Sequence, residues 1–185
     1  MLLQLDIQLL DCGEPAIWRK LLVPGHFTFH KLHRVIQVAF GWSNSHLYEF
    51  VDQPVNSELI ITLPEYSAER DIVYSKRVRL TQYLTTAGDD LFYIYDYGDD
   101  WKHYLRVEEV FDNDAVVANI IGGEGKTPPE DIGGPYGFID FKKAINDPAH
   151  EEYYEYREWL RLKETEVWNR HEFNLPEVQH RLIRI

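Results

Sequence analysis

Apolar and polar residues alternate in two short runs near the start of the chain. From Leu3 to Leu9 every second residue is leucine or isoleucine, and the residues between them are polar. Residues 17–23 alternate in a similar way after a polar turn that contains Gly13 and Pro15. Alternation with a period of two predicts half-buried strands, and two such runs around a short turn predict a hairpin.

The pattern changes between Thr28 and Phe40, where apolar residues recur at spacings of three and four. This period predicts an amphipathic helix with one buried face. Thr28 is a suitable residue to cap the start of that helix, and Gly41 is suitable for its end.

Both kinds of pattern return later in the chain. Strands are predicted at 46–51, 91–97 and 102–110, and the last two form a second hairpin around the turn Gly98-Asp99-Asp100. Residues 78–84 favour a short helix, whereas 52–78 show no clear pattern. Residues 122–137 are rich in glycine and proline and are predicted to be loop. Helices are predicted at 136–145 and 150–162, and 173–185 fits either a helix or an added strand.

This order of elements predicts an α+β fold with an antiparallel sheet built from hairpins and a helix packed on it. The opening hairpin, helix and strand are similar to the start of a β-grasp arrangement, by analogy of fold alone. We expect one domain over residues 1–185, in which 136–185 form a mainly helical C-terminal part.

Composition narrows the class of protein. The single cysteine, Cys12, excludes an intramolecular disulfide and a multi-cysteine zinc site. No run approaches the roughly 18 consecutive apolar residues that a membrane span needs, and the first residues lack the features of a signal peptide. We therefore expect a cytoplasmic protein that does not enter a membrane.

The net charge is −12, and most of the excess lies in the middle of the chain. Residues 89–131 contain 12 acidic and 3 basic residues. Such a segment repels phosphate groups, so direct binding to duplex nucleic acid is not expected. It favours a cation, a basic peptide or a basic partner protein, or serves as a solvated surface that keeps the protein soluble.

The densest cluster of chemically active side chains is the turn of the second hairpin. Between Tyr95 and His103 the sequence places three aspartates and one histidine among aromatic residues. Carboxylates at a turn bind hard cations, and histidine adds affinity for borderline metals. The alternative is structural, because Asp and Gly form turns and aromatic pairs stabilise hairpins.

Two further groups extend this candidate site. The glycine-rich loop displays Glu130 and Asp131, either to complete a cation or peptide site or as a loop that covers the core. His30 and His33 lie three residues apart on the first helix, either as structural residues or as ligands, and His46 opens the strand that follows. We expect His46, the Asp99 turn and Glu130-Asp131 to converge on one cleft. The candidate binding residues are His33, Trp42, His46, Asp96, Asp99, Trp101, His103, Glu130 and Asp131, and the candidates for metal ligands are His46, Asp99, His103 and Glu130.

Five segments in one order, 17–24, 32–42, 45–50, 95–103 and 128–137, resemble the plasmid pRiA4b ORF-three-like family. The resemblance covers residues 2 to about 180 and implies a single α+β domain. Many relatives have cysteines near the Pro-Pro-Glu-Asp stretch, where this chain has Asn119, Thr127 and Ile132, so a thiolate metal site is excluded here. Some relatives are labelled transposon passenger or resolvase, but an acidic chain without a basic arm is a poor recombinase.

Two classes of function remain. The first is a binding or adaptor domain, not an enzyme, that engages a protein or peptide partner through the aromatic and acidic hairpin around 95–103. The alternative is a metal-dependent hydrolase or nuclease-like enzyme, associated with mobile elements, that uses a divalent cation as its cofactor. Its active residues would come from His46, Asp96, Asp99, His103, Glu130 and Asp131.

Overall fold

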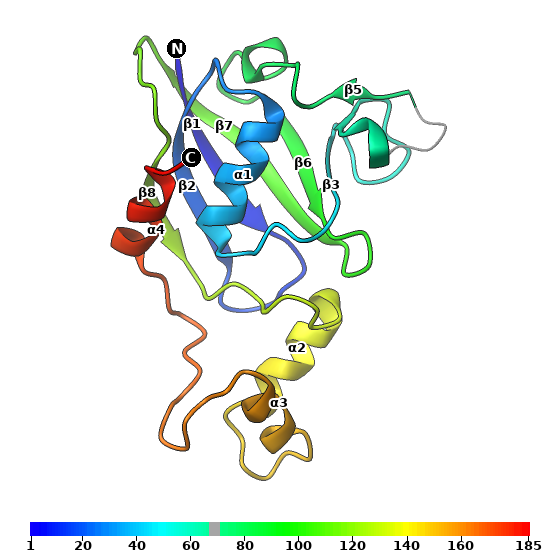
Figure 1. Cartoon of the computed structure of the whole chain (residues 1–185), viewed down its shortest axis with the longest axis vertical. Helices are drawn as coiled ribbons and strands as arrows, with labels where there is room; N and C mark the ends of the chain where they lie inside the picture. The colour runs from blue at the N-terminus through cyan, green and yellow to red at the C-terminus, as the bar shows by residue number, and fades with distance from the viewer. Residues whose placement is uncertain (67–70) are drawn as a thin grey trace.

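The computed structural model describes residues 1–66 and 71–185 and contains one sheet with a helix across it (Figure 1). Among these residues eight strands form the sheet, in the order β5-β4-β3-β6-β7-β1-β2-β8. The strands are β1 (Leu2–Leu9), β2 (Ile17–Pro24), β3 (Tyr48–Val51), β4 (Ile60–Thr62), β5 (Val73–Tyr74), β6 (Asp90–Tyr95), β7 (Trp101–Phe111) and β8 (Asn119–Glu124). The described pairs are antiparallel except for β4 with β5.

Both predicted hairpins are present. β1 pairs with β2 from Leu2 opposite Pro24 to Leu9 opposite Ile17, and β6 pairs with β7 around the predicted turn. β1 and β7 then pair with each other, which joins the two hairpins into the centre of the sheet. The apolar face of β1 is fully buried, as the alternation predicts.

α1 (Phe29–Phe40) lies across one face of this sheet (Figure 1). The Thr28 hydroxyl accepts a hydrogen bond from the Lys31 N–H at 3.2 Å and so caps the first turn. Gly41 ends the helix with a φ of 81°, the left-handed conformation that glycine adopts without steric cost. Leu32, Val35 and Ile36 face the sheet and are fully buried.

Three more helices follow the sheet: α2 (Gly134–Ala144), α3 (Tyr153–Trp159) and α4 (Leu175–Leu182). α2 and α3 extend from one end of the sheet, and α4 returns to lie beside β8 (Figure 1). Of the two alternatives for 173–185, the structure has a helix, over Leu175–Leu182. Short 3₁₀ turns occupy η1 (Pro64–Tyr66) and η2 (Leu80–Gln82), so the helix expected at 78–84 is only one turn long.

The glycine-rich segment 122–137 is not loop throughout. Its first residues extend β8, and its last residues begin α2. Glycine is required in the strand because aromatic side chains pack directly on it: a Cβ on Gly123 would lie 2.7 Å from the Phe173 ring. Composition alone predicts a loop here because it does not show which aromatic ring covers the backbone.

A buried arginine fastens the end of β8 to the rest of the fold. Arg19 is 3% exposed, and its side chain donates five hydrogen bonds: to the carbonyl oxygens of Trp18, Ala39, Glu124 and Gly125 and to the Thr127 hydroxyl. Its guanidinium also lies over the rings of Phe40 and Phe173. The loop after β8 therefore has a fixed starting point.

The described residues make an α+β domain, with a mostly antiparallel sheet and four α-helices. None of the helices in 1–66 or 71–185 has the length and apolar character of a membrane span.

Candidate functional site: an acidic cluster around His46

Three carboxylates surround the side chain of His46, and we call these four residues the acidic cluster. His46 Nδ1 lies 3.5 Å from Asp96 Oδ2, and His46 Nε2 lies 3.6 Å from Glu130 Oε2 and 3.3 Å from Asp131 Oδ1. The residues come from three places in the sequence: the loop before β3, the end of β6 and the loop between β8 and α2. Strand order brings His46 and Asp96 together, because β3 and β6 are neighbours in the sheet, and the loop after β8 brings Glu130 and Asp131 to them.

Three residues of the acidic cluster have the geometry of a metal-ligand set. One ligand atom each from His46, Asp96 and Asp131 lies within 4.8 Å of the others. Their side chains are 27%, 11% and 72% exposed, so the set is open to solvent on one side. An imidazole with two carboxylates suits borderline and hard divalent ions such as Zn²⁺ and Mn²⁺. The residues present therefore fit such an ion.

Asp96 owes its position to an unusual backbone conformation. It has a φ of 59°, in the left-handed region that aspartate tolerates better than most residues. Its N–H donates to the Leu47 carbonyl at 2.9 Å, and its Oδ1 accepts from the Gly98 N–H at 2.9 Å. Both bonds hold the start of the hairpin turn. The other carboxylate oxygen is then left to face His46.

Glu130 is held by a serine and a tyrosine. Its Oε1 accepts from the Ser43 N–H at 2.8 Å and from the Ser43 hydroxyl at 3.0 Å. The Tyr95 hydroxyl donates to the same carboxylate at 3.3 Å. Burial, and then the nearby charge of Glu130, raises the pKa of Tyr95 to about 12. Tyr95 therefore remains protonated at neutral pH and acts as a donor to Glu130.

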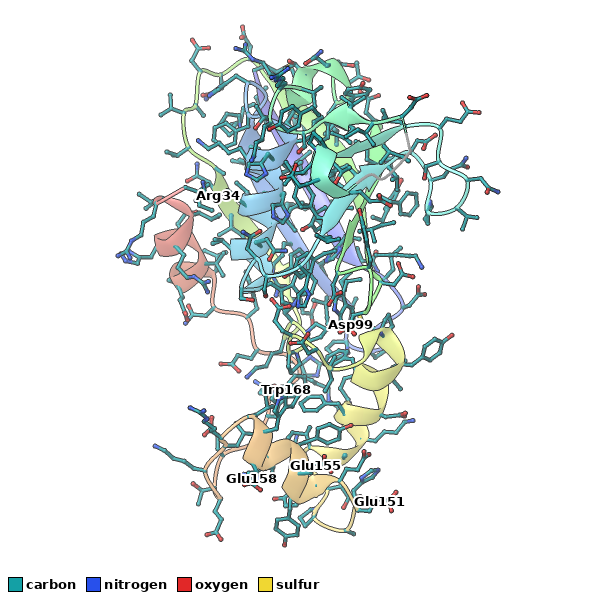
Figure 2. All side chains as sticks on the ribbon, turned by 45° about the vertical axis from the view of Figure 1, so that its right-hand side comes forward. Arg34, Asp99, Glu151, Glu155, Glu158 and Trp168 are labelled. Carbon is teal, nitrogen blue, oxygen red and sulfur yellow. The ribbon has the colours of Figure 1, made fainter. Side chains whose placement is uncertain are left out.

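Asp99 lies at the end of the sheet where α2 begins (Figure 2). Burial raises the pKa of its carboxyl, the charges of Asp96 and Asp131 raise it further, and the backbone amides of Gly133 and Gly134 oppose this. Gly134 has a φ of 69°, and a Cβ there would collide with the Asp99 carbonyl oxygen. Glycine thus allows the loop that carries Glu130 to approach the hairpin turn.

Other predicted site residues are in the core and not at the surface. Trp101 and His103 are fully buried, because they continue the inward alternation of β7. His103 packs edge-on against Phe40 and Trp42. Burial lowers the pKa of His103 to about 3, so its ring is neutral in the folded protein. The structure does not bring His103 to the acidic cluster, and neither it nor Trp101 can contact a ligand at the surface.

Trp42 is also buried, but it connects the core to the acidic cluster. Its ring stacks on Tyr95 with centroids 4.9 Å apart, and its Nε1–H donates to the Pro128 carbonyl at 3.3 Å. Trp42 therefore holds the Pro128–Glu130 segment above Tyr95. This is a positioning role and not direct contact with a ligand.

Sequence reasoning missed Ser43, which donates to Glu130, and Gln37, whose side-chain oxygen accepts from the Asn44 N–H at 2.9 Å. Ser43 belongs to a short polar loop, Ser43-Asn44-Ser45, directly before His46. A run of turn-forming residues next to a candidate ligand is a signal that could have pointed to it. Gln37 gives no such signal, because it lies on the helix that the apolar pattern describes.

A groove of about 450 Å³ opens beside the acidic cluster. Glu130 lines the groove and belongs to the acidic cluster, so the groove and the cluster are continuous. The floor and walls of the groove include Phe40, Trp42, Pro129, Phe173 and Val178. Its size is in the range of ligand-binding clefts.

Comparisons with other proteins place this structure in a family. The "Uncharacterized protein y4hQ" of Sinorhizobium fredii (strain NBRC 101917 / NGR234) is 38% identical over 152 residues, which are 81% of this chain and 76% of that protein. The crystal structure of the protein of unknown function MM3350 from Methanosarcina mazei Go1 is similar, with a TM-score of 0.77, 26% identity and 95% of each chain covered. The model of the plasmid pRiA4b ORF-3-like protein family matches residues 1–177, and the chain belongs to this family.

Proposed function

We propose that the protein binds a divalent metal ion at the acidic cluster, through His46, Asp96 and Asp131. The observation that carries the proposal is the convergence of one imidazole and two carboxylates within 4.8 Å on a solvent-accessible surface. Three carboxylates beside one histidine are electrostatically costly without a counter-ion, and a bound cation removes that cost.

The same geometry supports a hydrolytic use of the ion. Catalytic metal sites have three protein ligands and leave a position for water, whereas structural sites are closed. A bound divalent ion would lower the pKa of such a water. Glu130 lies 3.6 Å from His46 Nε2. The N–H and hydroxyl of Ser43 and the hydroxyl of Tyr95 donate to Glu130 and fix its orientation. Its carboxylate is placed to accept a proton from a reactant near His46.

The metal-binding test uses the full chain, stripped with a chelator and titrated with Mn²⁺, Zn²⁺ or Mg²⁺ in a calorimeter. We expect one site per chain for Mn²⁺ or Zn²⁺, and a loss of affinity of at least about 100-fold in His46→Ala and Asp96→Asn. Asp100→Asn is the matched control, because Asp100 also has a positive φ in the same turn but pairs with Lys102. If His46→Ala binds as tightly as the wild type, the proposed site is wrong.

A second candidate is the binding of a protein or peptide partner. The observation that favours it is the groove beside the acidic cluster, which offers apolar side chains to an extended segment and, at Glu130, a carboxylate to a basic residue. Val178→Trp would obstruct the groove and changes no residue of the acidic cluster. We expect this variant to lose binding to basic, aromatic peptides on an array that the wild type retains, and equal binding by both proteins would exclude the groove.

The proposal includes two expectations about partners and location. The excess of acidic residues in 89–131 should prevent a mobility shift of duplex DNA at low micromolar protein when EDTA is present. A shift under these conditions would contradict the acidic-surface argument.

A buried, unpaired Cys12 is compatible with a cytoplasmic location.

A further inference from the structure

Four polar residues form a closed ring of hydrogen bonds beneath the loop that leads to His46. His33 and Gln37 come from α1, Tyr93 comes from β6, and Asn44 lies in the loop itself. Gln37 Nε2 donates to the Tyr93 hydroxyl at 3.0 Å, and the Asn44 N–H donates to Gln37 Oε1 at 2.9 Å. The two nitrogens of His33 face the Tyr93 hydroxyl, at 2.8 Å, and Asn44 Oδ1. We call these four residues the polar ring.

The direction of each hydrogen bond follows from the chemistry of its partners. Asn44 Oδ1 can only accept, so His33 Nε2 carries the proton. His33 Nδ1 is then bare and accepts from the Tyr93 hydroxyl, which accepts in turn from Gln37. Each of the four hydrogen bonds in the ring therefore has one donor and one acceptor, and the imidazole is held in one tautomer.

Three of the four residues of the polar ring lie in the interior of the protein, and Asn44 joins them from the exposed loop. His33, Gln37 and Tyr93 are 1%, 2% and 0% exposed. His33 also stacks on the Tyr48 ring, with centroids 3.7 Å apart and planes at 8°. Hydrogen bonds at such a depth are strong when all are made and costly when one is missing. The ring thus favours one position of Asn44 over all others.

Asn44 is the middle residue of the loop Ser43-Asn44-Ser45, which leads to His46. It has a φ of 59°, and its neighbours on both sides contact the site. Ser43 donates twice to Glu130, and the Ser45 N–H donates to the Tyr95 hydroxyl at 3.2 Å. His46 follows directly. A change in the position of Asn44 would therefore move three groups together: the Ser43 donors to Glu130, the Ser45 N–H that donates to Tyr95, and the His46 imidazole.

We infer that the polar ring is a positioning device for the acidic cluster, and that Asn44 transmits its order to His46 and Glu130. The inference rests on the proposed function for its metal readout. Helix α1 does not need the ring, because the Gly41 N–H closes the helix on backbone carbonyls. An apolar set of side chains would fill the core equally well, but it would not fix the loop.

Two substitutions at the exposed Asn44 separate its side chain from its backbone conformation. Asn44→Gly keeps the positive φ but removes Oδ1, whereas Asn44→Asp keeps an acceptor for His33. A loss of about 10- to 100-fold in Mn²⁺ affinity is expected for Asn44→Gly, as for other residues that orient metal ligands. Asn44→Asp should bind at least as tightly as the wild type. The control is Asn56→Gly, since Asn56 is also exposed with a positive φ of 56° in a different loop.

A second readout does not require a metal. The readout is the ¹⁵N order parameter of the backbone amides of 43–46. It should be about 0.85 in the wild type and in the Asn44→Asp and Asn56→Gly variants, and it should fall below about 0.6 in Asn44→Gly. If 43–46 are equally rigid in Asn44→Gly, the polar ring does not position the loop. If the loop becomes mobile in Asn44→Gly but the wild type binds no metal, the positioning inference stands and the proposed function fails. If the loop becomes mobile but Mn²⁺ affinity is unchanged within about twofold, the link from the ring to the acidic cluster is wrong.

Discussion

The strands of the β6–β7 hairpin and the turn that joins them are adjacent in sequence but have opposite environments. Tyr93, Trp101 and His103 point into the core and are fully buried. In the turn, Asp99 and Asp100 are partly or largely exposed beside the acidic cluster. The same eleven residues, 93–103, therefore contain a hydrophobic anchor and a polar surface. Residue type alone does not separate these two roles.

The separation comes from the backbone. Along β7 the pleat sends alternate side chains to the core, so Trp101 and His103 share the inward face with Leu105 and Val107. At Asp96 the positive φ ends this regular geometry and directs the carboxylate to His46. A histidine on the strand is thus neutral and structural, whereas a histidine beside the turn faces three carboxylates.

The largest expected effect is on the buried side of the comparison. Trp101→Ala removes a fully buried indole and should lower the free energy of unfolding by about 3–5 kcal/mol. Lys102→Ala, its partly exposed neighbour on the opposite face, should change it by less than about 1 kcal/mol. Urea unfolding of both variants measures the difference. Equal midpoints would show that the two faces of β7 are assigned wrongly.

Acid should destabilise the buried side next. Burial lowers the pKa of both His33 and His103 to about 3, from an ordinary value of 6.5. Between these values the unfolded chain binds more protons, so stability is complete above about pH 6.5 and falls as the pH decreases toward 3. Each histidine should contribute a slope of about 1 kcal/mol per pH unit between pH 4 and 6.

Urea midpoints measured from pH 4 to pH 7 test this slope. His103→Leu should show a shallower dependence on pH than the wild type, whereas His171→Leu, at an exposed position, should not. An unchanged slope in His103→Leu would mean that this ring is not kept neutral by burial.

The smallest effect on stability is expected at the acidic cluster. Asp131 has a side chain that is 72% exposed, so Asp131→Asn should change the free energy of unfolding by no more than about 0.5 kcal/mol. The same change should weaken Mn²⁺ binding, because it removes a charged ligand. A thermal melt with and without Mn²⁺ separates these effects. Strong destabilisation without metal would make Asp131 a structural residue.

Much of the fold could be predicted from the sequence because its signals are local. Alternation identifies both hairpins, and the spacing of apolar residues identifies α1 together with its caps at Thr28 and Gly41. The inward position of His103 was also accessible, since it shares its parity with Leu105. The aspartates and aromatic residues around His103 favour the interpretation that it lies in a surface site, although its parity predicts burial.

The acidic cluster could be predicted only in part. Its residues were visible as candidates, but the distances among His46, Asp96 and Glu130 depend on strand order, which sequence spacing does not determine. The polar ring could not be predicted at all. Gln37 takes part only because α1 crosses β6 at the height of Tyr93, and this is a property of the packed structure.

The most direct test of the acidic cluster is a crystal of the protein soaked in Mn²⁺ and measured for anomalous scattering. We predict one strong peak within about 2.6 Å of a His46 ring nitrogen and of carboxylate oxygens from Asp96 and Asp131. The peak should disappear in crystals of His46→Ala. A fully occupied peak elsewhere, with none at His46, would contradict the proposal that this cluster is the metal site.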